Sequence, residues 1–307
     1  FLNTTEKFSD KYLYYYKKNT QWIGLKGKDI KNAVKEISCG LEALEINVQD
    51  KVAIMSNNSP RWAMADYGIL SSGSVTVTIY PTLIQNQVDY ILKDSGSKVI
   101  FVENKEQLDK AVKAKESCSE LKNIIVMNDT YEGDDSTIMN FLDFLELGNK
   151  YANENNVDFS EMVSRSKPDD LLTLIYTSGT TGTPKGVMLT HGNLCANITS
   201  TVKGIEFTDD DTLLSFLPLS HVFERMGGHF SSFSKGCTIY YAEGIERVAD
   251  NMGEVKPTLM LSVPRLYEKM YTGVMEKVKA GSPLKQKIFF WSLNVGQKVV
   301  EHSLINK

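Results

Sequence analysis

The segment that decides the fold reads Leu174-Ile175-Tyr176-Thr177-Ser178-Gly179-Thr180-Thr181-Gly182-Thr183-Pro184-Lys185-Gly186. It starts as an apolar strand and continues into a loop rich in glycines and hydroxyl side chains, with a single lysine near its end. Glycines let backbone N–H groups approach a ligand closely, hydroxyls donate further hydrogen bonds, and the ammonium adds positive charge. The segment therefore predicts a loop that binds a polyphosphate.

This loop differs from the Walker A loop, which needs Gly-Lys followed by Ser or Thr before a helix. Here Pro184 precedes Lys185, and Gly186–Thr190 continues as a predicted strand. The loop therefore joins two strands, and no helix dipole helps to hold the phosphate. The alternative is a flexible Ser/Thr/Gly linker between domains, which would need neither the preceding strand at 171–176 nor the Pro-Lys pair.

Composition and charge describe a globular protein. The chain has 307 residues, enough for one large domain or two ordinary ones, with 42% hydrophobic and 23% charged residues. A net charge of -4 argues against a nucleic-acid partner, because no basic surplus exists to neutralise phosphates. Position 1 is Phe, and the chain stops in the wake of a helical pattern at 301–307, so we expect both ends to be cut.

The cysteines are far apart, with neither a C-x-x-C pair nor zinc spacing: Cys39, Cys118, Cys195 and Cys237. They predict reduced structural thiols in a cytosolic protein. No apolar run approaches the length that crosses a bilayer, and no signal peptide opens the chain. We therefore expect a cytoplasmic location and leave open a peripheral contact with the inner face of a membrane.

Strand and helix patterns alternate along the first half of the chain. Asn58-Ser59-Pro60 reads as a helix start, with a capping hydroxyl and a proline in the first turn. Predicted strands cover 51–56, 75–79, 99–102 and 124–127, and predicted helices cover 27–44, 60–73, 83–94, 105–117 and 138–147. The alternation predicts an α/β fold of mostly parallel sheets with flanking helices.

The second half continues the alternation beyond a polar interval at 148–168, which we interpret as a surface connection between two packed βα lobes that meet near 150–170. Predicted strands follow at 212–217, 238–242 and 258–262, and helices at 191–203, 221–233, 245–254, 264–279 and 284–300. The aromatic run at 12–16 favours packing of an N-terminal helix over base stacking, because no basic groove accompanies it.

The stretch 176–187, Tyr-Thr-Ser-Gly-Thr-Thr-Gly-Thr-Pro-Lys-Gly-Val, resembles the signature phosphate loop of the adenylate-forming enzymes: acyl-CoA synthetases, luciferases and peptide-synthetase adenylation domains. The stretch 215–225 resembles the family segment that lines the carboxylate-substrate pocket. Its His-x-x-Glu-Arg variant is most similar to long-chain fatty acyl-CoA synthetases, as are the Pro-Thr at 257–258 and the Val-Pro-Arg at 263–265. Stretches at 50–62 also look like this family.

The resemblance implies that residues 1–307 are the N-terminal part of an adenylate-forming (AMP-binding) domain, incomplete at its C-terminal side and without the C-terminal lid domain. The family's aromatic-Gly-x-Thr-Glu motif, whose glutamate holds magnesium, has no match after Ile205. The ribose-binding aspartate motif, the hinge and the lid lysine are also absent. We therefore expect this stretch alone to be inactive.

The activity that the resemblance implies is an ATP-dependent acid–thiol ligase of fatty acid and lipid metabolism. A long-chain fatty acid and ATP, with Mg²⁺, would give acyl-AMP, and coenzyme A would then take the acyl group. Two alternatives stay open. One is a ligase for another carboxylic acid or for an acyl-carrier-protein acceptor, and the other is a non-catalytic nucleotide- or acyl-binding module.

The resemblance also assigns roles to residues. The ATP phosphates would lie against Thr177, Ser178, Gly179, Thr180, Thr181, Gly182, Thr183 and Lys185. Thr177 would stand at the magnesium ion, and the Lys185 cation would act catalytically on the departing pyrophosphate. The acid would meet His221, Val222, Glu224 and Arg225, with His221 as a neutral catalytic donor. From the residues alone, His221 can equally be a satisfied structural histidine, and Glu224 and Arg225 a solvated first-turn pair.

Overall fold

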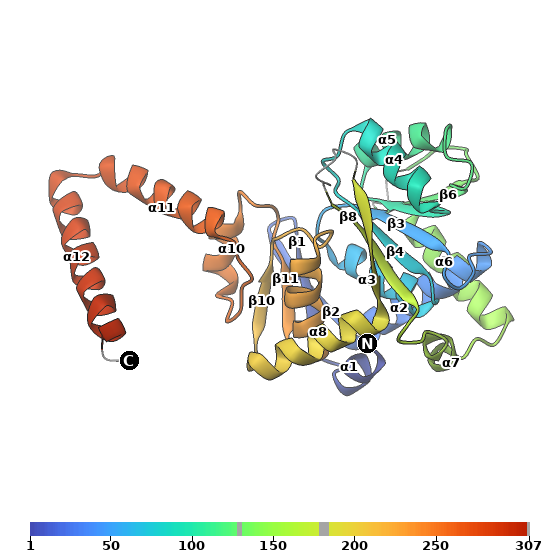
Figure 1. The fold of residues 1–307 in the computed structure, drawn as a ribbon, viewed down its shortest axis with the longest axis horizontal. Helices are drawn as coiled ribbons and strands as arrows, with labels where there is room; N and C mark the ends of the chain where they lie inside the picture. The colour runs from blue at the N-terminus through green and yellow to red at the C-terminus, as the bar shows by residue number, and fades with distance from the viewer. Residues whose placement is uncertain (128–130, 178–183, 306–307) are drawn as a thin grey trace. The chain divides into compact units, whose positions relative to one another are not determined.

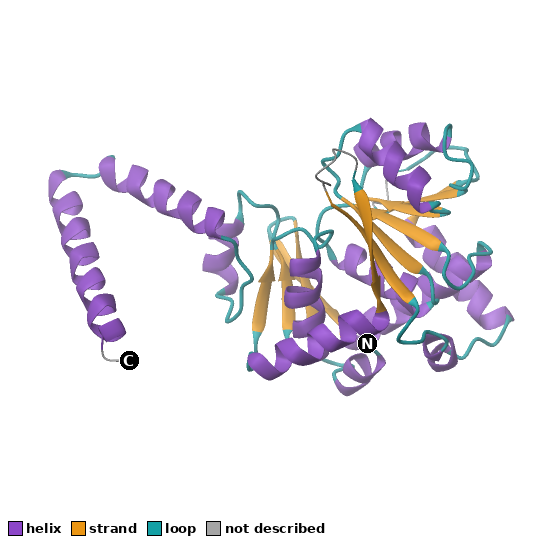
Figure 2. Cartoon of the chain, viewed as in Figure 1, coloured by secondary structure: helices purple, strands orange, loops and turns teal. Residues whose placement is uncertain are grey.

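The described residues form two β-sheets, shown as the two groups of orange strands in Figure 2. The structure, a computed structural model, describes residues 1–127, 131–177 and 184–305. The chain divides into two compact units, Phe1–Leu261 and Ser262–Lys307, and both sheets belong to the first unit (Figure 1). The two lobes expected to meet near 150–170 stay a prediction.

The larger sheet has seven strands in the order β7-β6-β5-β3-β4-β8-β9. Its neighbours pair in parallel except β8 and β9, which form an antiparallel hairpin. The strands are β3 (Lys51–Met55), β4 (Val75–Ile79), β5 (Val99–Val102), β6 (Asn123–Val126), β7 (Ile138–Asn140), β8 (Leu171–Thr177) and β9 (Lys185–Thr190). The α/β class with mostly parallel sheets is confirmed.

Apolar side chains bury both faces of this sheet. Val52 and Ile54 of β3 face a cluster that includes Trp62, whereas Ala53 and Met55 face a second cluster on the other side. This division follows from the two-residue period of a strand. The helices that supply these clusters are α2 (Gly27–Ala43), α3 (Pro60–Ser71) and α6 (Phe141–Glu154) for the first, and α4 (Gln85–Ser95) and α5 (Lys105–Lys115) for the second.

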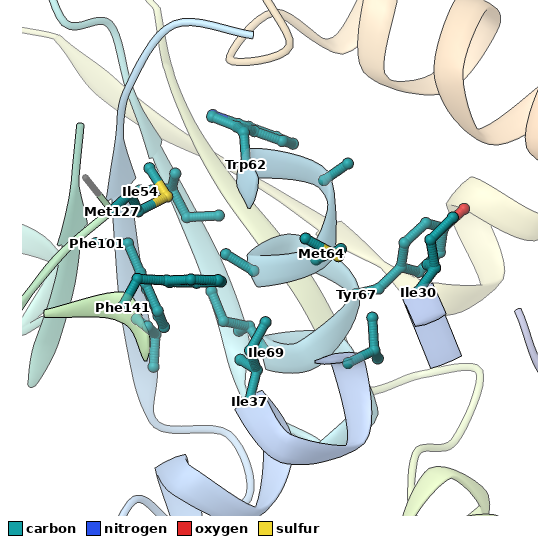
Figure 3. Packing of buried hydrophobic residues seen from close by; sticks show 14 of the residues in the cluster. Ile30, Ile37, Ile54, Trp62, Met64, Tyr67, Ile69, Phe101, Met127 and Phe141 are labelled. Atoms are coloured by element: carbon teal, nitrogen blue, oxygen red, sulfur yellow. The ribbon is translucent and has the colours of Figure 1, made fainter. Parts of the chain in front are cut away.

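The first cluster is the larger core. Figure 3 shows Ile54 and Phe101 of the sheet beside the helix that carries Trp62 and Met64. Burying one such side chain contributes about 1.5–3 kcal/mol. Helix α3 begins where the sequence predicts, because the Ser59 hydroxyl accepts a hydrogen bond from the Trp62 N–H at 3.1 Å and Pro60 stands at its first turn.

The smaller sheet has the order β10-β11-β1-β2, with β1 parallel to β11 and antiparallel to β2. Its strands are β1 (Tyr12–Lys18), β2 (Gln21–Lys26), β10 (Thr212–Ser215) and β11 (Thr238–Tyr241). The predicted helix packing of the aromatic run was therefore wrong. Tyrosine favours strands, and cross-strand ring contacts stabilise this one: Tyr15 stacks on Tyr240 with ring centroids 4.4 Å apart.

The interval 138–168 also differs from the prediction of one helix followed by a surface connection. Ile138–Asn140 is edge strand β7, α6 runs to Glu154, and a further helix, α7 (Phe159–Ser164), buries Phe159 and Met162. Gly148 explains how α6 packs so closely on α2, since a Cβ there would lie 1.8 Å from the Glu36 carbonyl oxygen. The polar composition of the interval 148–168 thus gave no sign of the end of α6 and of α7, both of which carry buried side chains.

The remaining helices are α1 (Leu2–Lys7), α8 (His191–Gly204), the π-helix η1 (Phe223–Phe230), α9 (Ser231–Ser234) and α10 (Val248–Val255) in the first unit, and α11 (Pro264–Lys279) and α12 (Pro283–Ile305) in the second. The strand predicted at 258–262 is reduced to one isolated bridge between Leu213 and Leu259. None of the helices in the described ranges is long and apolar enough to cross a membrane.

Candidate functional site

A cleft of about 590 Å³ opens where strands of both sheets end. Most of its walls come from the residues that directly follow five strands: 56–59 after β3, 80–82 after β4, 103 after β5, 216–218 and 220 after β10, and 242–246 after β11. In open α/β sheets, ligands bind outside the carboxyl ends of parallel strands. Its size also falls within the usual range for small-molecule sites.

Three of the charged groups that line the cleft, Lys17, Glu103 and Glu243, are held by neighbours. The Glu103 carboxylate accepts hydrogen bonds from the Asn57 backbone N–H at 2.9 Å and from Asn57 Nδ2 at 2.8 Å. The Lys17 ammonium lies 3.3 Å from Glu243 and 2.8 Å from Glu254. These contacts hold the charged side chains in place within a lining that is partly polar and partly apolar.

The two stems of the predicted phosphate loop meet at this same edge of the larger sheet. Thr177 ends β8, Lys185 begins β9, and the two residues are cross-strand partners with exposed side chains. Strand β8 runs parallel to β4, so Thr177 leaves the sheet at the edge where Tyr80 enters the cleft. The predicted phosphate ligands Ser178, Gly179, Thr180, Thr181, Gly182 and Thr183 lie outside the described residues.

Helix α4 anchors both stems. The Tyr176 hydroxyl donates to the Asp94 carboxylate at 2.6 Å, and the Tyr90 hydroxyl donates to the Pro184 carbonyl at 3.1 Å. Burial, followed by the hydrogen bond and charge of Asp94, raises the pKa of the Tyr176 hydroxyl, which therefore stays protonated. The residues before Thr177 and Lys185 are thus fixed to one turn of one helix.

His221 lies at the end of the 216–220 loop, and its side chain is exposed, like that of Val222. Its Nδ1 accepts a hydrogen bond from the Phe223 backbone N–H at 3.1 Å. A neutral imidazole that accepts at Nδ1 carries its proton on Nε2. The ring therefore presents an Nε2–H donor, the form that suits a carboxylate ligand.

Arg225 is buried instead of solvated. Its Nε and Nη2 donate to the two Asp66 carboxylate oxygens at 2.8 and 2.5 Å, and Nη1 donates to the Thr173 hydroxyl at 2.7 Å. Both charged side chains are 3% exposed. This bidentate pair ties η1 to α3 and β8, and its partners occupy the guanidinium. The solvated interpretation of Arg225 was wrong, and its predicted contact with the acid stays a prediction.

Glu224 is buried as well. Its Oε1 accepts a hydrogen bond from the Ser215 hydroxyl at 2.6 Å. Burial raises the pKa of this carboxyl to about 8, so it is largely protonated at neutral pH. Neither Glu224 nor Arg225 lines the cleft, and neither do Thr177, Lys185 and His221. The residues just before His221, among them Pro218 and Ser220, do line the cleft.

The described residues hold no group of three or more His, Cys, Asp or Glu side chains that could bind a metal ion. Mg²⁺, however, usually keeps several waters and takes other ligands from substrate phosphates and one or two protein groups. The exposed Thr177 hydroxyl at the stem of the loop fits that pattern. The role of Thr177 as a ligand of the ion stays a prediction.

Sequence reasoning missed most of the cleft. Asn57, Tyr80, Glu103 and the loop 242–246 belong to no recognised motif, yet each follows a predicted strand directly. The rule that ligands bind at the carboxyl edge would have selected these positions. The order of strands across two sheets, which brings them together, is not readable from local patterns.

Comparisons with known proteins match nearly the whole chain to one family. A family model described as AMP-binding enzyme matches residues 1–301. Among curated relatives, a long-chain-fatty-acid–CoA ligase ACSBG2 of Xenopus laevis is 32% identical over 96% of this chain and 41% of its own length. The rat protein of the same name is 30% identical over 100% and 47%. The chain thus spans about half the length of these relatives.

Solved structures show the same fold. An anthranilate CoA ligase in complex with anthranoyl-AMP superposes with a TM-score of 0.74 at 21% identity, covering 87% of this chain and 50% of that one. The adenylation domain of a carboxylate reductase from Mycobacterium chelonae gives 0.75 at 21% identity, covering 94% and 49%.

Proposed function

Because the chain belongs to the AMP-binding enzyme family, we propose that the protein is a ligase that activates a carboxylic acid with ATP as an acyl adenylate and passes the acyl group to coenzyme A. The observation that carries the proposal is a contact between two elements. The Thr78 hydroxyl of β4 donates to the Ser220 carbonyl at 3.0 Å. Thr78 is also the register partner of Ile175 in β8. The 216–220 loop, which ends at His221, and the strand that leads into the phosphate loop therefore both contact β4.

This arrangement suits the chemistry of adenylation. A carboxylate oxygen attacks the α-phosphorus while pyrophosphate leaves, a step that needs positioning and charge neutralisation more than covalent participation. The Nε2–H of His221 is a donor for the acid, and Lys185 supplies a cation for the departing charge. Mg²⁺, when bound with ATP, supplies further neutralisation of the phosphates.

Long-chain fatty acid is the acid that we propose, and coenzyme A the acceptor. The support is the name of the curated relatives, which are long-chain-fatty-acid–CoA ligases. A long acyl chain that is buried contributes roughly 0.8 kcal/mol per methylene, so kcat/KM should climb steeply from acetate to palmitate. Acetate or an aromatic acid as the best substrate would overturn this choice of acid.

The test of the activity is direct detection of the intermediate. The protein at its natural full length, rather than residues 1–307 alone, is incubated with ATP, Mg²⁺ and palmitate without coenzyme A. Acyl-AMP is then measured by mass spectrometry. We expect adenylate that depends on the acid and disappears, as acyl-CoA forms, when coenzyme A is added. No adenylate with any acid from acetate to palmitate would overturn the proposal and favour a non-catalytic binding module.

A further inference from the structure

Asn58 makes contacts that the start of helix α3 does not require. Its Nδ2 donates to the Leu217 carbonyl at 2.7 Å, and its Oδ1 accepts from the Leu219 N–H at 2.8 Å. The α3 cap itself is formed by Ser59. The amide of Asn58 therefore pairs with the backbone of a loop about 160 residues further along the chain, in the way that one strand pairs with another.

The same amide also contacts the buried groups below the loop. Its Nδ2 lies 3.2 Å from the Ser215 hydroxyl, which donates to Glu224. Ser215 and Glu224 are fully or almost fully buried. Such a network holds its members in one arrangement, because a buried polar group without a partner is costly. Together with the bond from Thr78 to Ser220, it fixes the loop at both of its ends.

This loop forms part of the cleft wall and ends at His221. Phe216, Leu217, Pro218 and Ser220 line the cleft, and the backbone bond from Phe223 to the His221 ring fixes the tautomer that offers Nε2–H. A displacement of the loop would move the His221 donor relative to the cleft without removing either.

We propose that Asn58 is a positioning residue for the acid-activating step, acting through the 216–220 loop on His221. The inference rests on the proposed function. The amide is required because it offers a donor and an acceptor side by side. An aspartate at this position would place a carboxylate oxygen against the Leu217 carbonyl and lose the donor.

The structure offers a matched control at the opposite edge of the same sheet. Gln49 Nε2 donates to the Leu171 carbonyl at 3.2 Å, and Gln49 Oε1 accepts from the Leu171 N–H at 3.1 Å. This amide also pairs with a distant backbone, but it lies before β3, away from the cleft. Asn58→Asp and Gln49→Glu are therefore the same chemical change at two edges of one sheet.

The experiment measures acyl-AMP formation and Tm in the intact protein for both variants, and for Asn58→Asp combined with His221→Ala. We expect both single variants to lower Tm to a similar degree, and only Asn58→Asp to lower kcat for adenylation, by up to about 10-fold, the loss expected for His221→Ala itself. In the His221→Ala background, Asn58→Asp should cost less than 3-fold further, since the two residues act on one step.

Two outcomes would contradict the inference in different ways. If the wild-type protein forms adenylate but the losses at Asn58 and His221 multiply, or Gln49→Glu lowers kcat equally, the positioning role alone is overturned. If the wild-type protein forms no adenylate with any acid, the positioning role and the proposed function fall together.

Discussion

The two edges of the seven-stranded sheet use polar side chains in opposite ways. At the amino edge, Gln49 pairs with Leu171, and Lys98 makes a 2.8 Å ion pair with Asp50, so neighbouring loops are bound directly to each other. At the carboxyl edge, Asn58 and Thr78 reach across to the loop of the other sheet, and a cleft of about 590 Å³ lies between the strand ends. Similar hydrogen bonds therefore have different results. At the amino edge they join adjacent segments with no cleft between them, and at the carboxyl edge they hold the wall of a cleft that can admit a ligand.

The largest expected effect separates two lysines. Lys185→Met at the carboxyl edge should slow ATP–pyrophosphate exchange, because it removes a cation beside the developing charge. The expected loss of transition-state stabilisation is about 2–4 kcal/mol. Lys98→Met at the amino edge removes the ion pair with Asp50 and should lower Tm with an unchanged exchange rate. Equal loss of exchange in both variants would erase the functional contrast between the edges.

The two edges should also respond to pH with opposite signs. Burial raises the pKa of Glu224 from an ordinary 4.5 to about 8, so its folded state holds a proton that the unfolded chain has already lost. Stability from this group is fully present below about pH 4.5 and falls by about 1.4 kcal/mol per pH unit as pH rises to about 8. Glu224→Gln should flatten this slope in denaturant titrations between pH 5 and 8.

Asp50 provides the contrast. Burial alone would raise its pKa, but the hydrogen bond and charge of Lys98 and the Asn47 N–H outweigh burial and lower it below 3.8. Its contribution is therefore present above about pH 3.8 and is lost as pH falls further. Asp50→Asn should change stability at neutral pH and leave the slope between pH 5 and 8 intact. A slope that survives Glu224→Gln would contradict the assignment to Glu224.

Two histidines give a smaller contrast. His221→Ala should reduce kcat/KM for the acid about 10-fold, in the range expected for one lost hydrogen bond to a charged ligand. His191 follows β9 at the amino edge, and burial lowers its pKa. His191→Gln should therefore leave kcat/KM for the acid within 2-fold, measured with the same adenylate assay. A larger loss at His191 than at His221 would place the acid elsewhere.

The smallest expected effect concerns the stem of the phosphate loop. Tyr90→Phe removes only the hydroxyl that donates to the Pro184 carbonyl, so packing is retained. We expect KM for ATP to rise about 3-fold, because one neutral hydrogen bond is worth about 1 kcal/mol or less. Steady-state kinetics at saturating acid would detect it, and an unchanged KM for ATP would show that the stem needs no anchor from α4.

Local patterns predicted the larger sheet well and the site only in part. Strands β3, β4, β5 and β6 are short apolar runs between turn signals, and such runs are buried in any α/β protein. The stems at Thr177 and Lys185 follow from one motif. Strand β1 was missed, because its tyrosines carry no clear period and its parallel partner β11 lies more than 200 residues away.

Burial of charged residues was equally hard to foresee. Glu224 and Arg225 open a helix, a position where charged side chains are usually solvated. The burial of these two side chains is evident only in the folded structure, where α3 brings Asp66 to Arg225 and Ser215 lies against Glu224. The role of Asn58 is hidden for the same reason, since both of its backbone partners lie in the loop that follows β10 of the other sheet.

The pairing of β1 with β11 also sets a delay during protein synthesis. Lys18 ends β1 and Thr238 begins β11, 220 residues later (238 − 18). At 5–20 residues per second, the pairing edge of the β1–β2 hairpin waits about 10–45 s for its neighbour. An open strand edge invites aggregation, and lysines at strand ends oppose it. Lys17, Lys18 and Lys26, at the ends of this hairpin, would keep the nascent edge apart from other chains until β11 emerges.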